Sequence, residues 1–91
     1  MFKTLEELIA VIRQRKESSN EKSYTKKLLN NKKLNIEKVK EEITELVDAI
    51  EKNTNKVHEA TDVLYHLMVL LEANGIKIED VMDELKKRQK K

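Results

Sequence analysis

Two pairs of acidic residues have the types and the spacing that metal-assisted chemistry needs. Glu42 and Glu45 form the first pair, and Glu59 and Asp62 form the second. The members of each pair are three positions apart, and helical residues at that spacing lie about 60° apart on one face. Each pair would therefore present two carboxylates side by side if its segment is helical.

The segment between the two pairs determines whether they can meet. It contains Asn53-Thr54-Asn55, a polar sequence that favours a turn between helices. Two helices joined by so short a turn run antiparallel, so all four carboxylates could converge. Four carboxylates at one point repel one another unless a cation lies between them, and hard divalent ions such as Mg²⁺ prefer oxygen ligands. The sequence thus predicts a Mg²⁺ site across a helical hairpin.

The composition predicts the fold class. The 91 residues include one Gly and no Pro, and 40% of them are charged while 3% are aromatic. A chain with so few helix breakers favours helix throughout. Its length suits one domain, residues 1–91, with a modest core. We therefore expect an all-α bundle of four to five helices.

Charge, cysteine content and hydropathy restrict the function classes. The formal net charge of +2 is too small to indicate nucleic-acid binding by itself, although basic residues gather at 26–40 and leave a local anionic partner open. The absence of Cys excludes disulfides and thiol catalysis and fits a reducing cytosol. There is no signal-peptide pattern, and the longest apolar run, residues 63–71, is too short to span a bilayer. We expect a soluble, cytoplasmic protein.

The helices that must position the carboxylates follow from apolar periodicity. The first should open with a capping box, in which Thr4 caps the helix and Glu7 reaches back. Polar connections are expected at 17–22 and 30–35, and the later helices at 36–52, 55–74 and 78–88, with Gly75 as a left-handed stop. The third helix should bury one stripe, with the carboxylates at its edge: Ile36, Val39, Ile43, Leu46, Val47 and Ile50. The fifth should bury Ile78, Val81, Met82 and Leu85.

The fourth helix contains a segment, residues 63–71, that is apolar around nearly its whole circumference. Such a helix must be covered on all sides, which a chain this small does not easily do alone, so we expect a twofold dimer. His66 lies within this segment, four residues after Asp62. It could be a hydrogen-bonded core residue with Asp62 as its partner, or it could support the metal ligands or bind substrate.

Several basic and hydroxyl residues could bind phosphate. Arg15 and Lys16 end the first helix, where cations also suit the helix dipole. Ser23 and Thr25 could cap a short helix ending at Leu29, or could form a phosphate site with the lysines that follow them. The residues alone leave both interpretations open.

The fuller acidic pattern, Glu41-Glu42-x-x-Glu45 followed by Glu59-x-x-Asp62, resembles that of the all-α nucleotide pyrophosphohydrolases of MazG type. Within that superfamily the chain is most similar to the phosphoribosyl-ATP pyrophosphohydrolases of histidine biosynthesis. The closer match covers about Leu5 to Arg88 and is carried by Arg15-Lys16, Ser23-Tyr24-Thr25-x-Lys27-Leu28, Lys38-Val39-x-Glu41-Glu42, Asp62-x-Leu64-Tyr65-His66 and Gly75.

The resemblance implies a helical homodimer that hydrolyses the α–β phosphoanhydride of phosphoribosyl-ATP to phosphoribosyl-AMP and pyrophosphate. It implies Mg²⁺ ligands at Glu42, Glu45, Glu59 and Asp62, and catalytic roles for Glu41, Glu42 and Glu45, with Glu41 orienting water or a ligand. A divalent ion would screen the anhydride, and a carboxylate would accept the proton of the attacking water. Substrate contacts are implied for Arg15, Lys16, Ser23, Tyr24, Lys27 and Lys38, and His66 is a further candidate.

Departures from the family pattern and two alternatives remain. His58 stands where an acidic residue is usual, and Asn31 and Lys40 stand where Gly is common. A general nucleoside-triphosphate pyrophosphohydrolase would share the metal site and differ in its substrate contacts. A non-catalytic helical interaction protein would gain nothing from Mg²⁺ and lose nothing when Glu42 is changed.

Overall fold

The structure, a computed structural model, describes residues 1–18 and 23–89. Within these ranges the chain forms five α-helices: α1 (Lys3–Glu17), α2 (Tyr24–Leu29), α3 (Lys32–Lys52), α4 (Lys56–Ala73) and α5 (Ile78–Gln89). The described residues contain no β-strand, which confirms the predicted all-α fold. In the same ranges no helix combines the length and the apolar character that crossing a bilayer requires.

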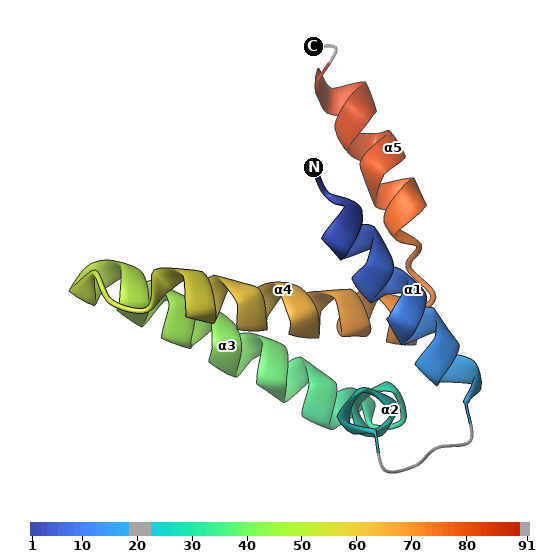
Figure 1. Cartoon of the computed structure of the whole chain (residues 1–91), viewed down its shortest axis with the longest axis horizontal. Coiled ribbons are helices and arrows are strands. Elements are labelled where there is room, and N and C mark those ends of the chain that lie inside the picture. The colour runs from blue at the N-terminus through green and yellow to red at the C-terminus, as the bar shows by residue number, and fades with distance from the viewer. Residues whose placement is uncertain (19–22, 90–91) are drawn as a thin grey trace.

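Helices α3 and α4 form the antiparallel hairpin that the Asn-rich turn predicts (Figure 1). Asn53 and Asn55 adopt left-handed backbone conformations, with φ of 55° and 47°. Asn tolerates this region better than most residues, so the chain can reverse here without a glycine. The N–H of Thr54 donates to the carbonyl of Ala49 at 3.0 Å and satisfies an end of α3.

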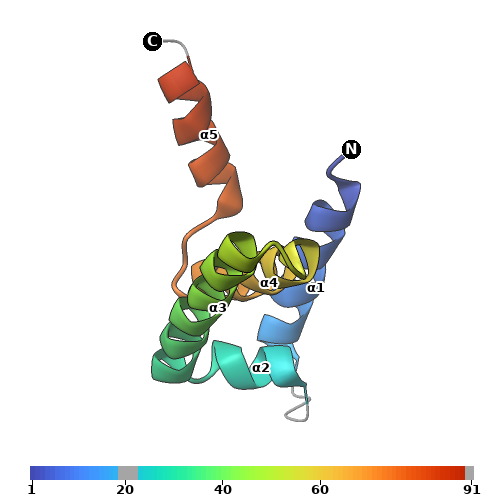
Figure 2. The same ribbon diagram turned by 90° about the vertical axis from the view of Figure 1, so that its left-hand side faces the viewer.

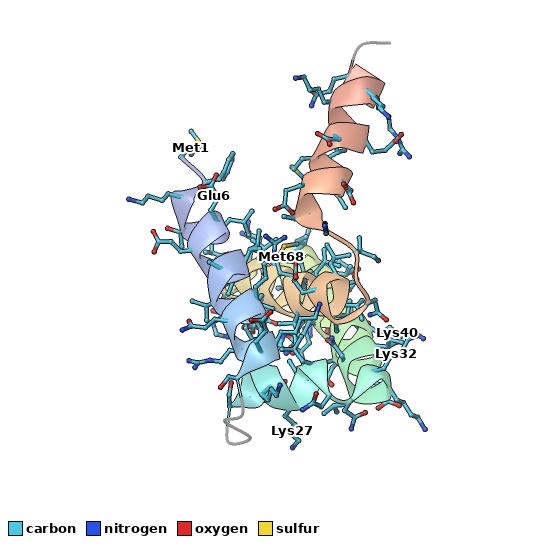
Figure 3. All side chains as sticks on the ribbon, turned by 90° about the vertical axis from the view of Figure 1, so that its right-hand side faces the viewer. Met1, Glu6, Lys27, Lys32, Lys40 and Met68 are labelled. Atoms are coloured by element: carbon cyan, nitrogen blue, oxygen red, sulfur yellow. The ribbon has the colours of Figure 1, made fainter. Side chains whose placement is uncertain are left out.

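The core lies where α1 and α2 cross one half of this hairpin. It consists of buried apolar side chains from three helices: Ile9, Ile12, Leu28, Met68 and Val69. Figure 3 shows Met68 at the centre of the molecule, whereas Lys27, Lys32 and Lys40 extend away from it. The turn end of the hairpin projects beyond α1 and α2 in Figure 1, so the described residues leave that end uncovered.

Two predicted helix starts have different outcomes. The capping box at Thr4 is wrong, because α1 begins at Lys3 with Phe2 as its N-cap, and the N–H of Glu6 donates to the carbonyl of Phe2. Thr4 is then already helical and cannot adopt the N-cap geometry. Ser23 does cap α2, since its Oγ accepts from the N–H of Lys26 at 3.4 Å. Of the connection expected at 17–22, residues 19–22 lie outside the described residues.

The connection expected at 30–35 is shorter than the sequence suggested. Asn31 caps α3, its Oδ1 accepting from the N–H of Leu34 at 3.1 Å, so the helix begins at Lys32. The lysines of this first turn point to solvent, which is why a polar segment can be helical. Asn35 thereby comes to lie in α3 and is completely buried, two turns before Glu42.

The apolar stripe predicted for α3 is only partly buried within one chain. Val39 and Ala49 face the interior, but Ile43, Val47 and Ile50 are 46%, 49% and 56% exposed. The face of α3 that packs on α4 is not its most hydrophobic face. It is the neighbouring face, which carries Glu42. The prediction that all six residues form a buried stripe is therefore wrong within one chain, and Ile43, Val47 and Ile50 leave an apolar face open.

Helix α5 leaves the bundle after Gly75, whose φ of 70° confirms the predicted left-handed stop (Figures 1 and 2). Ile78 packs against the core, whereas Met82 and Leu85 are nearly half exposed and α5 contains no buried residue. The prediction of a buried stripe along α5 is wrong for a single chain, because Ile78 is the α5 residue that packs against the core cluster and no residue of the helix is buried.

A polar contact fixes that first turn. Nη2 of Arg13 in α1 lies 2.7 Å from Oε1 of Glu79, and Nε of Arg13 donates to Oε2 of Glu72 in α4 at 3.0 Å. The guanidinium of Arg13 lowers the pKa of Glu79 to about 2 because it stabilises the charged carboxylate. Three helices thus meet at one arginine, which the sequence did not predict.

Candidate active site

Glu42 is the buried acidic residue of α3, with 8% of its surface exposed. Its carboxylate lies close to those of Glu41 and Glu45, and one oxygen from each of the three lies within 4.8 Å of the others. The helix repeat explains the cluster, because these positions share one face of α3. Glu41 and Glu45 are exposed, so the cluster runs from solvent into the hairpin.

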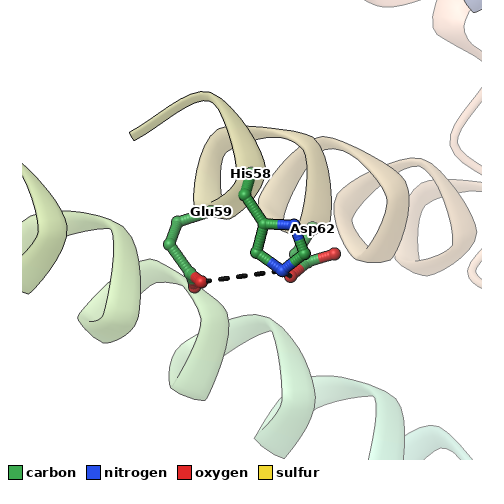
Figure 4. Close-up of side chains that lie close together, drawn as sticks. All are labelled: His58, Glu59 and Asp62. Carbon is green, nitrogen blue, oxygen red and sulfur yellow. Dashed lines mark ion pairs between the residues drawn. The ribbon is translucent and has the colours of Figure 1, made fainter. Parts of the chain in front are cut away.

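A second cluster faces it from α4. His58, Glu59 and Asp62 each bring one potential ligand atom within 4.8 Å of the others (Figure 4). The side chain of Glu59 is 17% exposed and that of Asp62 is 37% exposed. The spacing of these positions, three and four residues, again places them on one face of the helix.

Glu45 of α3 and Glu59 of α4 line the same cavity near the turn of the hairpin, so the two clusters adjoin. Burial raises the pKa of Glu42, and the negative charges of Glu45 and, more weakly, Asp62 raise it further. Burial also raises the pKa of Glu59, and the carboxylate of Glu45 adds to the effect. Such interactions weaken with distance, so carboxylates from α3 and α4 converge between the helices. Their role as metal ligands stays a prediction.

These residues fit a hard divalent cation. Oε2 of Glu42 and Oε2 of Glu59 are buried without a hydrogen-bond partner. Among the described residues no Lys or Arg forms an ion pair with Glu42, Glu45, Glu59 or Asp62. Buried carboxylate oxygens that lack a donor are costly, and an ion such as Mg²⁺ would satisfy them with the ligand type it prefers.

The raised pKa values predict how stability depends on pH and on Mg²⁺. A carboxyl group whose pKa rises on folding stabilises the fold below its unfolded pKa, about 4.3 for Glu, and that stability is lost as pH rises through the folded pKa. Without metal, we expect the melting temperature to fall between mildly acidic and neutral pH. Millimolar Mg²⁺ should reverse the loss at neutral pH, by about 4–8 °C for each kcal/mol of binding free energy.

Thermal melts by circular dichroism, with EDTA or Mg²⁺ at several pH values, measure this effect. Glu51→Gln, on the exposed side of α3, is the control for general effects of charge. A melting temperature that does not change across millimolar Mg²⁺ in the unmodified protein would contradict the metal site.

His66 connects α2 to this site. It is 7% exposed, and its Nδ1 lies 2.8 Å from the backbone carbonyl of Asp62. A carbonyl only accepts, so Nδ1 carries the proton, and in the neutral ring Nε2 accepts from the hydroxyl of Tyr24 at 3.0 Å. Both ring nitrogens are therefore occupied. The partner that the sequence suggested, Asp62, is correct, but the contact is with its main chain.

Aromatic packing reinforces the same connection. The rings of Tyr24 and Tyr65 lie 6.3 Å apart, centroid to centroid, and the hydroxyl of Tyr65 contacts Oγ1 of Thr25. Thr25 is thus a buried partner of α4 and not a helix cap. No local pattern predicts the contact between Thr25 and Tyr65, because the two residues are 40 positions apart.

The basic candidates lie in two different places. Nζ of Lys38 is 3.5 Å from Oε2 of Glu41, whose charge raises the pKa of Lys38. Lys27 projects from α2 into solvent (Figure 3). Lys16 instead donates to the carbonyl of Glu72 at 2.7 Å, ten residues beyond Asp62 and so about 15 Å farther along α4.

Lys16 is therefore not brought to the carboxylates of its own chain. Arg15, its neighbour at the end of α1, is half-buried. The substrate contacts predicted for both residues stay predictions.

Comparison with known proteins decides the family. The family model described as "Phosphoribosyl-ATP pyrophosphohydrolase" matches residues 5–89 of this chain. The chain belongs to the phosphoribosyl-ATP pyrophosphohydrolase family. This result confirms the resemblance found in the sequence, and it makes the chain a hydrolase by family.

Similarity to individual proteins supports the assignment to the phosphoribosyl-ATP pyrophosphohydrolase family. The chain is 46% identical to a phosphoribosyl-ATP pyrophosphatase of Clostridium novyi over 96% of its own length and 82% of the relative's. It is 46% identical to one of Pyrobaculum arsenaticum over 97% of each. It is also 44% identical to the histidine biosynthesis bifunctional protein HisIE of Pyrococcus furiosus, over 94% of this chain but 41% of that protein.

In this member of the phosphoribosyl-ATP pyrophosphohydrolase family, His58 is a potential ligand that the sequence analysis does not predict. The family pattern marks it only as the loss of one carboxylate. Its spacing of four residues from Asp62 was the signal that could have identified it, because residues at that spacing face the same way on a helix.

Proposed function

We propose that the chain hydrolyses the α–β phosphoanhydride of phosphoribosyl-ATP, giving phosphoribosyl-AMP and pyrophosphate in histidine biosynthesis. We further propose that Glu42, Glu45, Glu59 and Asp62 hold Mg²⁺ for this reaction. The observation that carries the proposal is the convergence of carboxylates from α3 and α4, two of which have buried oxygens without a partner. A cytoplasmic location stays a prediction from the sequence.

The exposure of each acidic residue indicates its role in the proposed reaction. When bound, the metal would screen the charge of the phosphates and acidify water. Glu42 and Glu59 are too enclosed to reach far into solvent, and they define the inner side of the site. The side chain of Glu41 is 52% exposed at the outer edge, where it can orient water and accept its proton.

The predicted substrate contacts fall into two groups: residues whose hydrogen bonds are used within the protein, and residues that can still contact a phosphate. Tyr24 donates its only hydroxyl proton to His66, so it cannot also donate to a phosphate, and we infer that it positions the start of α2. Ser23 uses its oxygen to cap that helix. Lys27 and Lys38 remain the best candidates for charge-assisted contacts with the leaving pyrophosphate.

A substrate comparison tests the proposed function. The purified chain is incubated with phosphoribosyl-ATP and with a panel of nucleoside triphosphates, with and without Mg²⁺, and released pyrophosphate is measured. We expect preferential hydrolysis of phosphoribosyl-ATP that requires the divalent ion. Equal hydrolysis of the panel would favour the general pyrophosphohydrolase, and no turnover with any substrate would favour the non-catalytic protein.

We also propose that the active form is a homodimer joined through the open apolar face of the hairpin. The exposed side chains Ile43, Val47 and Ile50 form a stripe on α3, while Val57 and Leu64 are exposed on α4. A second copy could cover them and the uncovered turn end.

A charge placed in this stripe should separate the subunits. We expect Val47→Glu to weaken dimerisation by about 100-fold or more, because an unpaired charge in an apolar interface costs about 3 kcal/mol or more. Analytical ultracentrifugation over a range of concentrations measures the dissociation constant. Gln14→Glu introduces the same charge at an exposed site on α1 and should leave the dissociation constant unchanged. An unaltered dimer in the Val47 variant would place the interface elsewhere.

A further inference from the structure

We propose that His58 supplies a nitrogen ligand beside Glu59 and Asp62, so that this chain binds a borderline transition ion of the Co²⁺ or Zn²⁺ type more tightly than an all-oxygen site would. The inference rests on the proposed cation site and assigns a ligand to it on α4. It concerns the choice of metal, and it leaves the hydrolytic reaction itself as described.

Interatomic distances within the cluster are those of ligands that share one ion. Nε2 of His58 lies 3.4 Å from Oδ2 of Asp62 and 3.9 Å from Oε1 of Glu59 (Figure 4). Two ligands at about 2.1 Å from an octahedral ion are about 3.0 Å apart when adjacent and about 4.2 Å apart when opposite. Both distances lie between these two values, so side-chain rotation alone could bring the atoms to positions around one ion.

The local structure gives an ion a path into the cluster. The side chain of His58 is 73% exposed and that of Asp62 is 37% exposed, while Glu59 is more enclosed at 17%. The three residues follow one another on a regular helix and are held by its backbone geometry. An ion can therefore approach from solvent, bind the outer atoms and keep water in its remaining positions.

A separate observation shows that this cluster has ligand capacity to spare. Glu42, more than nine-tenths buried, contributes an oxygen with no hydrogen-bond partner from the α3 side, and Glu59 contributes another. Glu42 and Glu59 belong to the two helices of the hairpin, α3 and α4. The contacts of His58 with Glu59 and Asp62 do not satisfy these inner oxygens.

Donor chemistry then predicts the metal preference. Mg²⁺ strongly prefers oxygen ligands, whereas Co²⁺ and Zn²⁺ accept imidazole nitrogen readily. The imidazole of His58 would supply a nitrogen donor of this kind. Replacing the imidazole with an oxygen donor should lower the affinity for the transition ions and change that for Mg²⁺ much less.

Calorimetric titration of the full chain with Co²⁺, Zn²⁺ and Mg²⁺ separately, before and after His58→Gln, tests this. We expect the Co²⁺ and Zn²⁺ affinities to fall at least about tenfold, the smallest loss typical of disturbing even an outer partner of a metal ligand. The Mg²⁺ affinity should change by less than that factor. Equal losses for all three ions, or no loss, would overturn the proposal.

The two histidines of the chain provide an internal control. In nuclear magnetic resonance spectra of the unmodified protein, Zn²⁺ should shift the ring signals of His58 far more than those of His66, whose nitrogens are both occupied. Unmoved His58 signals at saturating Zn²⁺ would reject ligation while Mg²⁺-dependent hydrolysis could still stand. Conversely, a lack of hydrolysis with every metal would reject the proposed function without touching this result.

Discussion

Replacing Glu42 with Gln should lower kcat/KM for phosphoribosyl-ATP by about 100- to 10,000-fold, the range associated with loss of a group that handles charge or protons at the reacting centre. Glu42 is buried between Glu45 and the α4 carboxylates, and one of its oxygens has no partner. The amide keeps the shape of the side chain but removes the negative charge and converts one potential ligand atom into a donor.

Steady-state kinetics at saturating Mg²⁺ measure the loss, and circular dichroism and ultracentrifugation verify that helicity and assembly are kept. Glu51→Gln makes the same chemical change on the exposed side of α3 and should be neutral. A fully active Glu42→Gln enzyme would reject the site assignment.

The same variant should be more stable than the unmodified chain when no metal is present. Burial and neighbouring negative charge raise the pKa of Glu42, so its charged form opposes folding at neutral pH. Removing the charge relieves that cost, and it should also reduce the stabilisation by Mg²⁺. Loss of activity together with higher metal-free stability would separate a functional role for Glu42 from a structural one.

Truncating Leu28 to Ala should reduce the free energy of unfolding by about 3 kcal/mol, within the range of about 2–5 kcal/mol found for buried Leu. Leu28 is fully buried in the core cluster formed by α1, α2 and α4. Leu28 is the fully buried apolar residue of the six-residue α2, so the cavity should also loosen the attachment of this helix to α4 and weaken substrate binding.

Urea denaturation at one fixed protein concentration measures the change, because the proposed dimer would make apparent stability depend on concentration. Leu85→Ala removes the same atoms from α5 at a position 46% exposed, and we expect it to cost about 0.5 kcal/mol or less. A loss of less than about 1 kcal/mol in the Leu28 variant would show that α2 contributes little to the core.

The sequence by itself determined the hairpin and the acidic residues that it brings together. Helical spacing places Glu42 beside Glu45 and Glu59 beside Asp62. The two left-handed asparagines of the turn reverse the chain between the two pairs. These features depend on interactions within a few residues, where propensity and period decide the outcome. The acidic pattern that resembles the family consists of these same short spacings.

Only the tertiary structure decided which faces of the helices meet. Glu42 faces α4 while Val47 stays exposed, although hydrophobicity alone favoured the opposite arrangement. Tyr24 reaches His66 across 42 positions, and Arg13 reaches Glu79 across 66. Such contacts depend on how whole helices cross, and that is set by packing among distant side chains and, we propose, by the second subunit.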